Sequence, residues 1–406
     1  MTLEEGKNSS DRDSTASGRK KTKKPQDRYQ GFEQGPIRPP SEAESLLIRL
    51  TRNCPWNRCT FCPVYKNRDF TLRSVDNIIR DIDLLSLYLD AIRKTAGKPG
   101  ASDMKAINAM FESFEVQDRT AFNAALHWYW SGMESIFIQD ANSLIMKPDD
   151  LVHVMEHIKK SFPMVRRITS YARSHTIVRI KDHDMQRIAH AGLNRIHVGM
   201  ESGSDQVLKR IKKGCTKEDH IKAGLKVKAA GMELSEYVMP GLGGVALSRE
   251  HALESADALN RIDPDFIRLR TLAIPGRAPL AEEWHRGAFE KCTDLMVAEE
   301  LKLFLESLHN ITSYIKSDHI LNLLEGVEGK MPEEKEKIVG VVDLFLSMSA
   351  EDQVYYQVGR RMGLFRSTWD MADTSLLEKV KETCRSYNVT VDNVDFVIEE
   401  LMKRFV

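Results

Sequence analysis

Short apolar segments alternate with amphipathic segments from about residue 45 to residue 280, and this alternation constrains the fold most. Six segments have the length of buried strands: SLLIRLTRN, MESIFIQD, VRRITSYAR, LNRIHVGMES, MELSEYVMPG and DFIRLRTLAIPG. Helical periodicity lies between them, and two helical segments end in Ala-Gly directly before a strand, where glycine supplies a left-handed cap. Strands that are buried on both faces and joined by helices form parallel sheets. The pattern therefore predicts an α/β fold, either an open doubly wound sheet or a full or partial barrel.

The regions on either side of this alternation differ from it. Residues 1–40 are rich in Ser, Lys, Arg, Gly and Pro, with the run GRKKTKKPQDR, and this composition predicts a disordered basic arm. Residues 41–280 form the expected core, with a helical insertion between about 95 and 130. Residues 281–406 show mostly helical periodicity and form a third region.

Charge and cysteine usage narrow the classes of function. The chain has 59 basic and 59 acidic residues, so no overall field favours nucleic acid or an anionic membrane as a partner. The sequence has no apolar run near 18 residues and no signal-like N-terminus, so we expect a soluble cytoplasmic protein without membrane contact. Six cysteines in a chain of this length do not suggest a disulfide framework, and a clustered trio indicates metal binding or catalysis.

The segment CPWNRCTFC contains the trio Cys54, Cys59 and Cys62 directly after the first predicted strand. In parallel α/β folds, ligands gather at the C-terminal ends of strands, so this position suits a functional site. A structural zinc site needs four closed ligands, and the nearest downstream histidine is the distant His127. An iron–sulfur cluster is the other metal interpretation, held either by three thiolates with one iron left open or by four ligands.

A fully ligated cluster needs a fourth thiolate. The other cysteines are Cys215, Cys292 and Cys384, which are far apart and lie on or beside predicted helices. Any of them could return as a fourth ligand, although packing as a small hydrophobic residue is the more ordinary fate of an isolated cysteine.

Together with the trio, the segments GMESGSDQVLKRIKKG and YVMPGLGG make the chain resemble the radical SAM superfamily from about residue 45 to 280. These two segments resemble the branch with the Elongator catalytic subunit, the methylthiotransferases and oxygen-independent coproporphyrinogen dehydrogenase. The resemblance implies a partial (βα)6 TIM-like barrel with a helical C-terminal region, and a [4Fe–4S] cluster held by Cys54, Cys59 and Cys62. S-adenosylmethionine (SAM) would bind the open iron. The cysteine spacing departs from the commonest family pattern, with four rather than three residues in the first interval.

The resemblance also implies residues that contact SAM. Glu201, with Ser202 beside it, corresponds to the polar residue that reaches the ribose, and Tyr237 to a second ribose contact. Lys213 corresponds to the cation that pairs with the SAM carboxylate, and Lys212 could substitute for it. A simpler interpretation is that Glu201 only fixes a turn and that Lys213 is a solvated charge at the end of a helix.

Four further contacts follow from the resemblance. Asp140 and Asn142, in the segment QDANSL, stand where acceptors would meet the SAM ammonium group, and Phe61 is the aromatic residue before the third cysteine. Arg173 is a candidate for binding SAM or substrate, and Gly241 belongs to a turn near the adenine. Asp140 or Asn142 could instead cap a turn, and the glycines could form a plain tight turn.

The activity that the resemblance implies is reductive cleavage of SAM to methionine and a 5′-deoxyadenosyl radical, which abstracts hydrogen from an unknown small molecule, lipid precursor or peptide. It also implies an electron donor such as flavodoxin or ferredoxin, and an oxygen-sensitive cluster. Two alternatives stay open: an RNA-modifying enzyme that uses the basic arm, and a noncatalytic iron–sulfur or SAM sensor. The C-terminal region is expected to close the barrel or shape the substrate pocket. Within it, Arg360 and Arg361 either grip an anionic group or lie on a surface helix.

Overall fold

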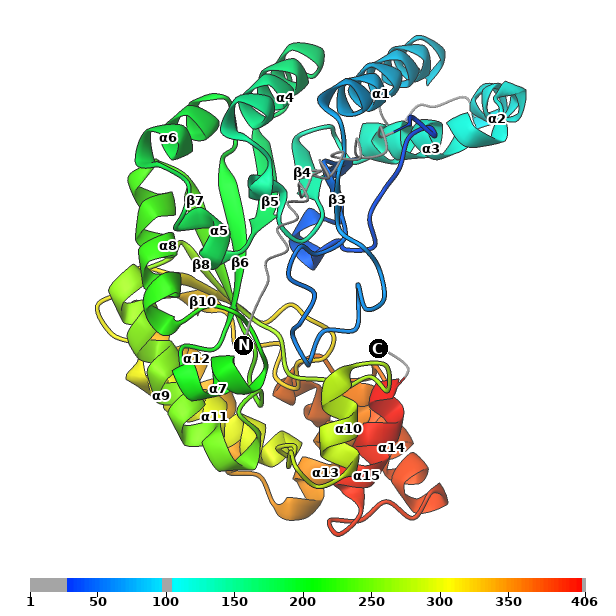
Figure 1. Cartoon of the computed structure of the whole chain (residues 1–406). Helices are drawn as coiled ribbons and strands as arrows, with labels where there is room; N and C mark the ends of the chain where they lie inside the picture. Colours follow the sequence, from blue (N-terminus) through cyan, green and yellow to red (C-terminus); the bar gives the residue numbers. More distant parts are fainter. Residues whose placement is uncertain (1–27, 97–103, 404–406) are drawn as a thin grey trace, which may run out of the picture.

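The computed structural model describes residues 28–96 and 104–403, and its centre is an eight-stranded sheet (Figure 1). Six parallel strands follow one another in chain order: β1 (Leu46–Arg49), β4 (Ser135–Gln139), β5 (Arg167–Ala172), β6 (Arg195–Glu201), β7 (Glu233–Val238) and β8 (Phe266–Leu269). In the described part of the chain β1 forms one edge of this sheet, which does not close on itself. The fold is therefore an α/β partial barrel with six βα strands, which confirms the expected class.

Two short strands extend the sheet within the region that was expected to be mostly helical. β9 (Tyr314–Lys316) pairs in parallel with β8, and β10 (Gly329–Lys330) pairs with β9 in the antiparallel direction. The expectation of a helical region was incomplete here, because strands of two or three residues are too short to show a periodic pattern.

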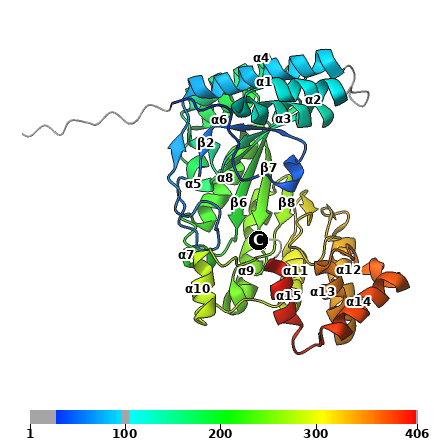
Figure 2. The same ribbon diagram turned by 90° about the vertical axis from the view of Figure 1, so that its right-hand side faces the viewer.

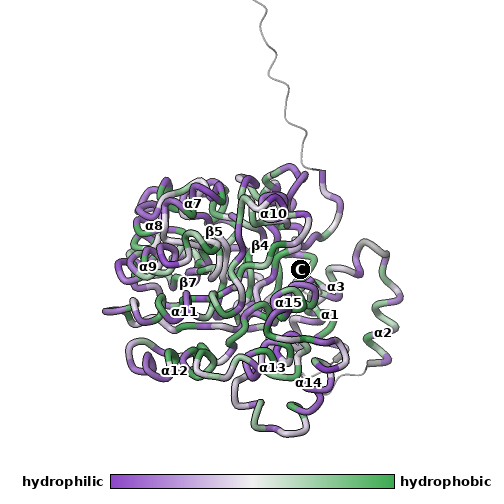
Figure 3. Tube along the Cα trace, turned by 90° about the horizontal axis from the view of Figure 1, so that it is seen from below, coloured by the Kyte–Doolittle hydropathy of each residue, from purple (hydrophilic) through white to green (hydrophobic). Residues whose placement is uncertain are grey.

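Helices cover the outer side of the sheet, and in Figure 1 α4, α6, α8 and α9 lie along it. The helices of the barrel and its insertion are α1 (Val75–Ala96), α2 (Met104–Ser113), α3 (Val116–Trp130), α4 (Pro148–Ser161), α5 (Ser174–Ile177), α6 (Asp182–His190), α7 (Asp205–Arg210), α8 (Lys217–Ala229) and α9 (Gly244–Ile262). The insertion predicted between about 95 and 130 corresponds to α2 and α3. Seen from below, the traces of α8, α9 and α11 (Asp294–Ser307) alternate between hydrophilic and hydrophobic residues, as expected for helices that cover a sheet (Figure 3).

Local sequence explains where these helices begin and which face they bury. α4 starts with Pro148 in its first turn, followed by two acidic residues that favour the positive end of the helix dipole. Its buried residues are Leu151, Val154, Met155 and Ile158. α8 starts with a capping box in which Thr216 and Asp219 each bond the other's backbone N–H.

The two faces of the sheet differ in chemistry. On β6, Ile196 and Val198 are fully buried in the main hydrophobic core with Val227 of α8, and each such side chain contributes about 1.5–3 kcal/mol by leaving water. The other face has aromatic and polar side chains, and the His197 ring lies 5.4 Å from Tyr171 between ring centroids. The parallel strands therefore present apolar residues to the helices and a more polar surface to the inside of the barrel.

Residues just before the expected boundary at residue 40 contact the barrel. Phe32 is buried, and Glu33 forms ion pairs with Arg49, Arg52 and Arg73. Composition alone could not reveal these long-range charge partners. The basic run of the expected arm lies outside the described residues.

The C-terminal helices gather at one end of the barrel, and α1–α4 lie at the opposite end (Figure 2). They are α10 (Pro279–His285), α11, α12 (Lys335–Leu346), α13 (Ala350–Arg361), α14 (Thr374–Ser386) and α15 (Val394–Met402). No helix within the described ranges is long and apolar enough to cross a membrane.

The paired arginines of α13 do not match either expectation. Arg360 and Arg361 are buried rather than on the surface, because internal partners hold both side chains. Arg360 donates to the Asn322 carbonyl at 3.2 Å, and Arg361 binds the Asp294 carboxylate at 3.0 Å. They therefore join α13 to neighbouring segments and are not free to grip an anion.

Candidate active site

The three-cysteine loop lies between β2 (Thr51–Arg52) and β3 (Thr71–Leu72), a short antiparallel ribbon that follows β1. The loop docks on the segment after α7. Thr60 donates its backbone N–H to the Ile211 carbonyl at 3.0 Å, and the Trp56 indole N–H donates to the Lys212 carbonyl at 2.7 Å. Gly214 has a φ of +75°, and a Cβ on it would stand 2.3 Å from the Trp56 ring. A side chain at position 214 would therefore push the cysteine loop away from its support.

The environment of the thiols fits an iron–sulfur cluster. Cys54, Cys59 and Cys62 are free and partly buried, and the Cys54 sulfur accepts the Asn57 backbone N–H at 3.4 Å. Burial raises the pKa of the Cys59 thiol, and the nearby Lys213 opposes this shift. Burial also raises the pKa of Cys62, and a hydrogen bond from the Val64 backbone opposes it. Backbone N–H groups and cations beside the sulfurs are features that stabilise bound thiolates in such clusters.

Among the described residues, no group of three or more His, Cys, Asp or Glu side chains could hold a single metal ion. A cubane cluster spreads its ligands over several irons, so this finding concerns only mononuclear sites.

Glu201 and Lys213 meet at the C-terminal end of β6. The Lys213 ammonium lies 3.1 Å from the Glu201 carboxylate and 5.8 Å from the centre of the Phe61 ring. Burial opposes the charge of Lys213, yet Glu201 and Cys59 together raise its pKa above the ordinary value. Glu201 has a φ of +63°, and the strand register shifts between Gly199 and Glu201, so a bulge re-aims this side chain. A Cβ on Gly199 would stand 2.2 Å from the Glu201 carboxylate, so glycine keeps this space free.

Arg173 joins three parts of the site. Its guanidinium donates to the Lys213 carbonyl at 2.7 Å and lies 5.1 Å from the centre of the Trp56 ring. Asn142 holds the backbone of the turn that follows β5. Its Oδ1 accepts the Arg173 backbone N–H at 3.0 Å, and its Nδ2 donates to the Thr176 hydroxyl at 2.8 Å. Both polar atoms of Asn142 are thus engaged, which favours the turn-capping interpretation over the expected contact with the SAM ammonium.

The carboxylate of Asp140 also has its hydrogen-bond partners within the protein. This carboxylate, which is buried, accepts hydrogen bonds from Arg49 at 2.8 Å, from the Tyr65 hydroxyl at 2.7 Å and from the Asn53 backbone at 3.2 Å. Because Asn53 directly precedes Cys54, the structure favours a role for Asp140 in holding the cysteine loop. The expected ammonium contact would have to compete with these three donors.

A buried network lies behind the predicted SAM face. The Ser202 hydroxyl is 2.8 Å from His251 Nδ1, and His251 Nε2 donates to the Met239 carbonyl at 3.0 Å. Glu300 accepts the Gly241 backbone N–H at 2.7 Å and the Ser248 hydroxyl at 2.5 Å. Ser202 therefore fixes the turn from inside the core, and Glu300 sets the conformation of the Gly241 loop.

Tyr237 lies on the inner wall of the barrel, where its ring centre is 5.7 Å from His197 and 6.1 Å from Tyr171. It is therefore part of the polar inner surface on β7, and contact with a ribose stays a prediction.

A small cavity of about 60 Å³ adjoins the third cysteine. Phe61 and Cys62 line it together with residues that follow β7 and β8: Met239, Arg270, Thr271, Ala273 and Pro275. Phe61 was predicted, whereas the residues after β7 and β8 were missed. The signal that could have found them was their position at the C-terminal ends of the fifth and sixth predicted strands, in the segments YVMPG and RTLAIPG.

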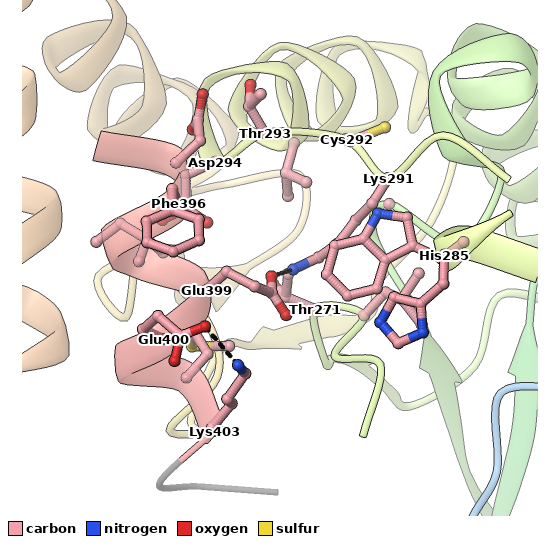
Figure 4. A pocket seen from close by; sticks show the side chains of 17 residues that line it. Thr271, His285, Lys291, Cys292, Thr293, Asp294, Phe396, Glu399, Glu400 and Lys403 are labelled. Carbon is pink, nitrogen blue, oxygen red and sulfur yellow. Dashed lines mark hydrogen bonds and ion pairs between the residues drawn. The ribbon is translucent and has the colours of Figure 1, made fainter. Parts of the chain in front are cut away.

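The isolated cysteines have separate environments. The Cys215 sulfur lies 3.2 Å from His220 Nε2, and Ser174 holds the other ring nitrogen of His220 at 2.7 Å. Cys384 is buried in the main hydrophobic core, as expected for a small apolar side chain. Cys292 lines a second and larger cavity of about 420 Å³, which Figure 4 shows.

Comparison with known proteins places this geometry in a family. The model of the radical SAM superfamily matches residues 48–256. The 4′-phospho-dehydrooxetanocin synthase of Priestia megaterium is 30% identical over 232 residues, which cover 53% of this chain and 26% of that protein. The tRNA uridine(34) acetyltransferase of Methanocaldococcus infernus is 26% identical over 110 residues, covering 27% of this chain and 21% of that protein. The chain thus spans about a quarter or less of the length of these curated relatives.

Two solved structures resemble the chain at low identity. Archaeal Methanocaldococcus infernus Elp3 with an N-terminal deletion is 16% identical with a TM-score of 0.39, covering 52% of this chain and 53% of that one. Methylornithine synthase PylB is 14% identical with a TM-score of 0.41, covering 68% of this chain and 66% of that one.

The matched range, residues 48–256, contains the three cysteines, Glu201 and Lys213. Enzymes of this superfamily use a [4Fe–4S] cluster and SAM, need a reductant and cleave SAM by a radical mechanism. The chain belongs to the radical SAM superfamily, and it is an enzyme whose cofactors are a [4Fe–4S] cluster and SAM.

Proposed function

We propose that Cys54, Cys59 and Cys62 hold the cluster and that this enzyme uses SAM to abstract hydrogen from a small organic substrate. One observation supports this assignment above the others. The three thiols lie on one loop beside a buried Lys213–Glu201 ion pair, and Lys213 also acts electrostatically on Cys59. A metal-binding loop and a cation suited to a carboxylate are thus adjacent.

The residues of the chain bind and orient the cofactor in this proposal. Lys213 pairs with the SAM carboxylate and Glu201 accepts a ribose hydroxyl, while the wall formed by Phe61, Met239 and Ala273 takes the adenine. When bound and reduced, the cluster supplies the electron that splits SAM into methionine and a 5′-deoxyadenosyl radical. Arg173 holds Lys213 and Trp56 together, which keeps the cofactor pocket fixed on the cysteine loop.

The proposal places the enzyme in a reducing compartment. All six cysteines are free, and a cluster with an open iron needs protection from oxidation. We therefore place it in the cytoplasm, with flavodoxin or ferredoxin as the electron donor.

Anaerobic reconstitution followed by dithionite and SAM tests this function. We expect 5′-deoxyadenosine to form, and we expect Cys59→Ala to abolish both the cluster and this product. Cys384→Ala is the matched control, because Cys384 lies in the hydrophobic core of the C-terminal region. A cluster that binds without SAM cleavage would favour the noncatalytic sensor instead.

An RNA-modifying enzyme is the second candidate, and the relatives named tRNA uridine(34) acetyltransferase favour it. In that case the basic run between Arg19 and Lys24 would contribute to RNA binding. Binding of tRNA that weakens steeply with salt, and that is lost on deletion of residues 1–27, would support this candidate.

A further inference from the structure

A cavity of about 420 Å³ lies where the barrel meets the C-terminal helices (Figure 4). Gly241 and Thr271, which follow β7 and β8, form its barrel side, and α10, the start of α11 and α15 complete it. Thr271 also lines the small cavity beside Cys62. The two cavities therefore share a lining residue, so the larger cavity adjoins the one beside the cluster loop.

The cations that line the cavity are already paired. Lys291 forms an ion pair with Glu399, and Lys403 forms one with Glu400, as the dashed lines in Figure 4 show. Asp294, which also lines the cavity, forms an ion pair with Arg361, which does not line it. A carboxylate partner thus offsets the positive charge of each lysine.

One carboxylate of the lining remains without such a partner. Asp395, on α15, is an exposed residue that lines the cavity, and no ion pair joins it to another residue within 28–96 and 104–403. Burial and the neighbouring Asp294 raise its pKa, while Lys291 opposes this shift. The electrostatic environment of Asp395 therefore favours an additional positive charge beside it.

Aromatic side chains provide apolar surface on the walls of this cavity. Phe396, on α15, is 70% exposed. Trp284, on α10, is half-buried and stacks on His285 with 5.5 Å between ring centres. In Figure 4, Phe396 and His285 stand on opposite sides of the cavity. A flat group between these sides would cover apolar surface that is otherwise wet.

We propose that this cavity is the substrate site and that it takes a small organic cation, an amine carried on an aromatic or other flat group. The inference rests on the proposed function, because it assigns the substrate of that radical chemistry. Asp395 pairs with the amine, and Trp284 and Phe396 contact the flat group. The Lys291–Glu399 ion pair holds α15 against the barrel and so keeps the cavity formed.

Three probes of similar shape and different charge test this assignment. The anaerobically reconstituted enzyme with bound SAM is titrated at pH 8 by calorimetry with 2-phenylethylamine, 2-phenylethanol and 3-phenylpropanoate. We expect the amine to bind about three- to tenfold more tightly than the alcohol, and the anion to bind most weakly. In Asp395→Asn, the amine should bind no better than the alcohol. Asp392→Asn is the matched control, since Asp392 is an exposed acid just before α15 that does not line the cavity.

Each outcome decides the proposal. Preference for the anion, or equal loss of amine binding in both variants, overturns it. Retained alcohol binding in Asp395→Asn shows that the variant cavity is intact. If that variant misfolds, the salt dependence of binding to the wild-type enzyme tests the proposal instead. Added salt should weaken binding of the amine but not of the alcohol. Equal effects on both probes would overturn the proposal. Formation of 5′-deoxyadenosine is measured separately, so failure of the cation site and failure of SAM cleavage are distinguishable.

Discussion

Lys213 Nζ lies 3.1 Å from Glu201 Oε1, and this ion pair joins the end of β6 to the loop after α7. Both side chains are largely buried, and the bulge at Glu201 aims its carboxylate toward the lysine. A buried ammonium with one carboxylate partner can still donate hydrogen bonds to a second anionic group through its other two N–H bonds. The pair therefore forms a place for a carboxylate close to Cys59, which is where the SAM carboxylate would lie.

Loss of the Lys213 charge should weaken SAM binding. We expect Lys213→Gln to raise the Kd for SAM by about 10- to 100-fold, since a hydrogen bond to a charged group contributes ~1.5–3 kcal/mol. Lys212→Gln is the control, because Lys212 is exposed and adjacent. Equilibrium dialysis of the reconstituted variants against labelled SAM measures both. A larger increase in the Kd for SAM in Lys212→Gln would show that Lys212, rather than Lys213, pairs with the SAM carboxylate.

Gly214→Ala should damage the cluster site. Alanine at a φ of +75° costs ~1–2 kcal/mol in backbone strain, and its Cβ would also stand 2.3 Å from the Trp56 ring. We expect reduced iron content after reconstitution, because the loop with the three cysteines must move. Gly132→Ala is a matched control, with a φ of +87° and no atom within 4 Å of the added Cβ. Equal loss of iron in both variants would show that backbone strain, and not the contact with Trp56, causes the effect.

Cys215→Ser should leave the cluster intact. Cys215 lies close enough to Cys59 for its charge state to matter, which makes it the isolated cysteine best placed to act as a fourth ligand. Its sulfur, however, contacts His220 Nε2, and a serine hydroxyl can form the same hydrogen bond. We expect wild-type iron and sulfide content and an unchanged absorption spectrum. Loss of iron in Cys215→Ser would show that the cluster has a fourth protein ligand.

The sequence predicted the parts of this protein that local patterns encode. Strand and helix alternation predicted a parallel α/β fold, and the family resemblance implied the partial barrel. The cysteine segment was expected after the first strand, and it lies in the loop between β2 and β3, which follow β1. The structure also brings together Glu201, Lys213 and Phe61 as the resemblance implied. These features depend on residues that are close in sequence or belong to one motif.

Long-range partners could not be predicted in the same way. Asp140 was expected to face SAM, but Arg49, Tyr65 and Asn53 occupy its carboxylate, and none of these contacts leaves a pattern in the sequence. The contact of α15 with the segment between α10 and α11 is equally invisible, because its ion pair joins Lys291 and Glu399 across 108 positions of chain. Tertiary packing therefore decided which polar residues remained available to a ligand.

Glu300→Gln should disturb the Gly241 loop without affecting the cluster. The Glu300 carboxylate accepts from the Gly241 N–H and the Ser248 hydroxyl, and an amide would turn an N–H₂ group toward one of these donors. An unsatisfied buried donor costs ~1–3 kcal/mol. We expect a higher KM for SAM with unchanged iron content, measured by initial rates of 5′-deoxyadenosine formation. An unchanged KM for SAM would show that the conformation of the Gly241 loop does not affect SAM binding.

Glu236→Leu should stabilise the protein and remove part of its pH dependence. Glu236, on β7, is fully buried, and neither carboxyl oxygen has a hydrogen-bond partner in the described part of the chain. Burial raises its pKa well above the ordinary value, so the folded protein keeps this proton to a higher pH than the unfolded chain does. The unfolded chain releases the proton as pH rises above about 4.5, and the folded state then binds more protons than the unfolded state. The contribution of Glu236 to stability therefore decreases as pH rises toward the folded-state pKa.

Replacement by leucine removes both this linkage and the desolvation of an unpaired polar group. We expect the free energy of unfolding at pH 7–8 to rise by about 1–3 kcal/mol, with a smaller gain near pH 5. Urea unfolding of the reconstituted enzyme at pH 5, 6, 7 and 8 measures the difference. Glu236→Gln distinguishes the two causes, because it removes the ionisable group but keeps an unpaired polar side chain. It should flatten the pH dependence with little gain in stability. A loss of stability in Glu236→Leu that is constant over this pH range would instead indicate a packing defect.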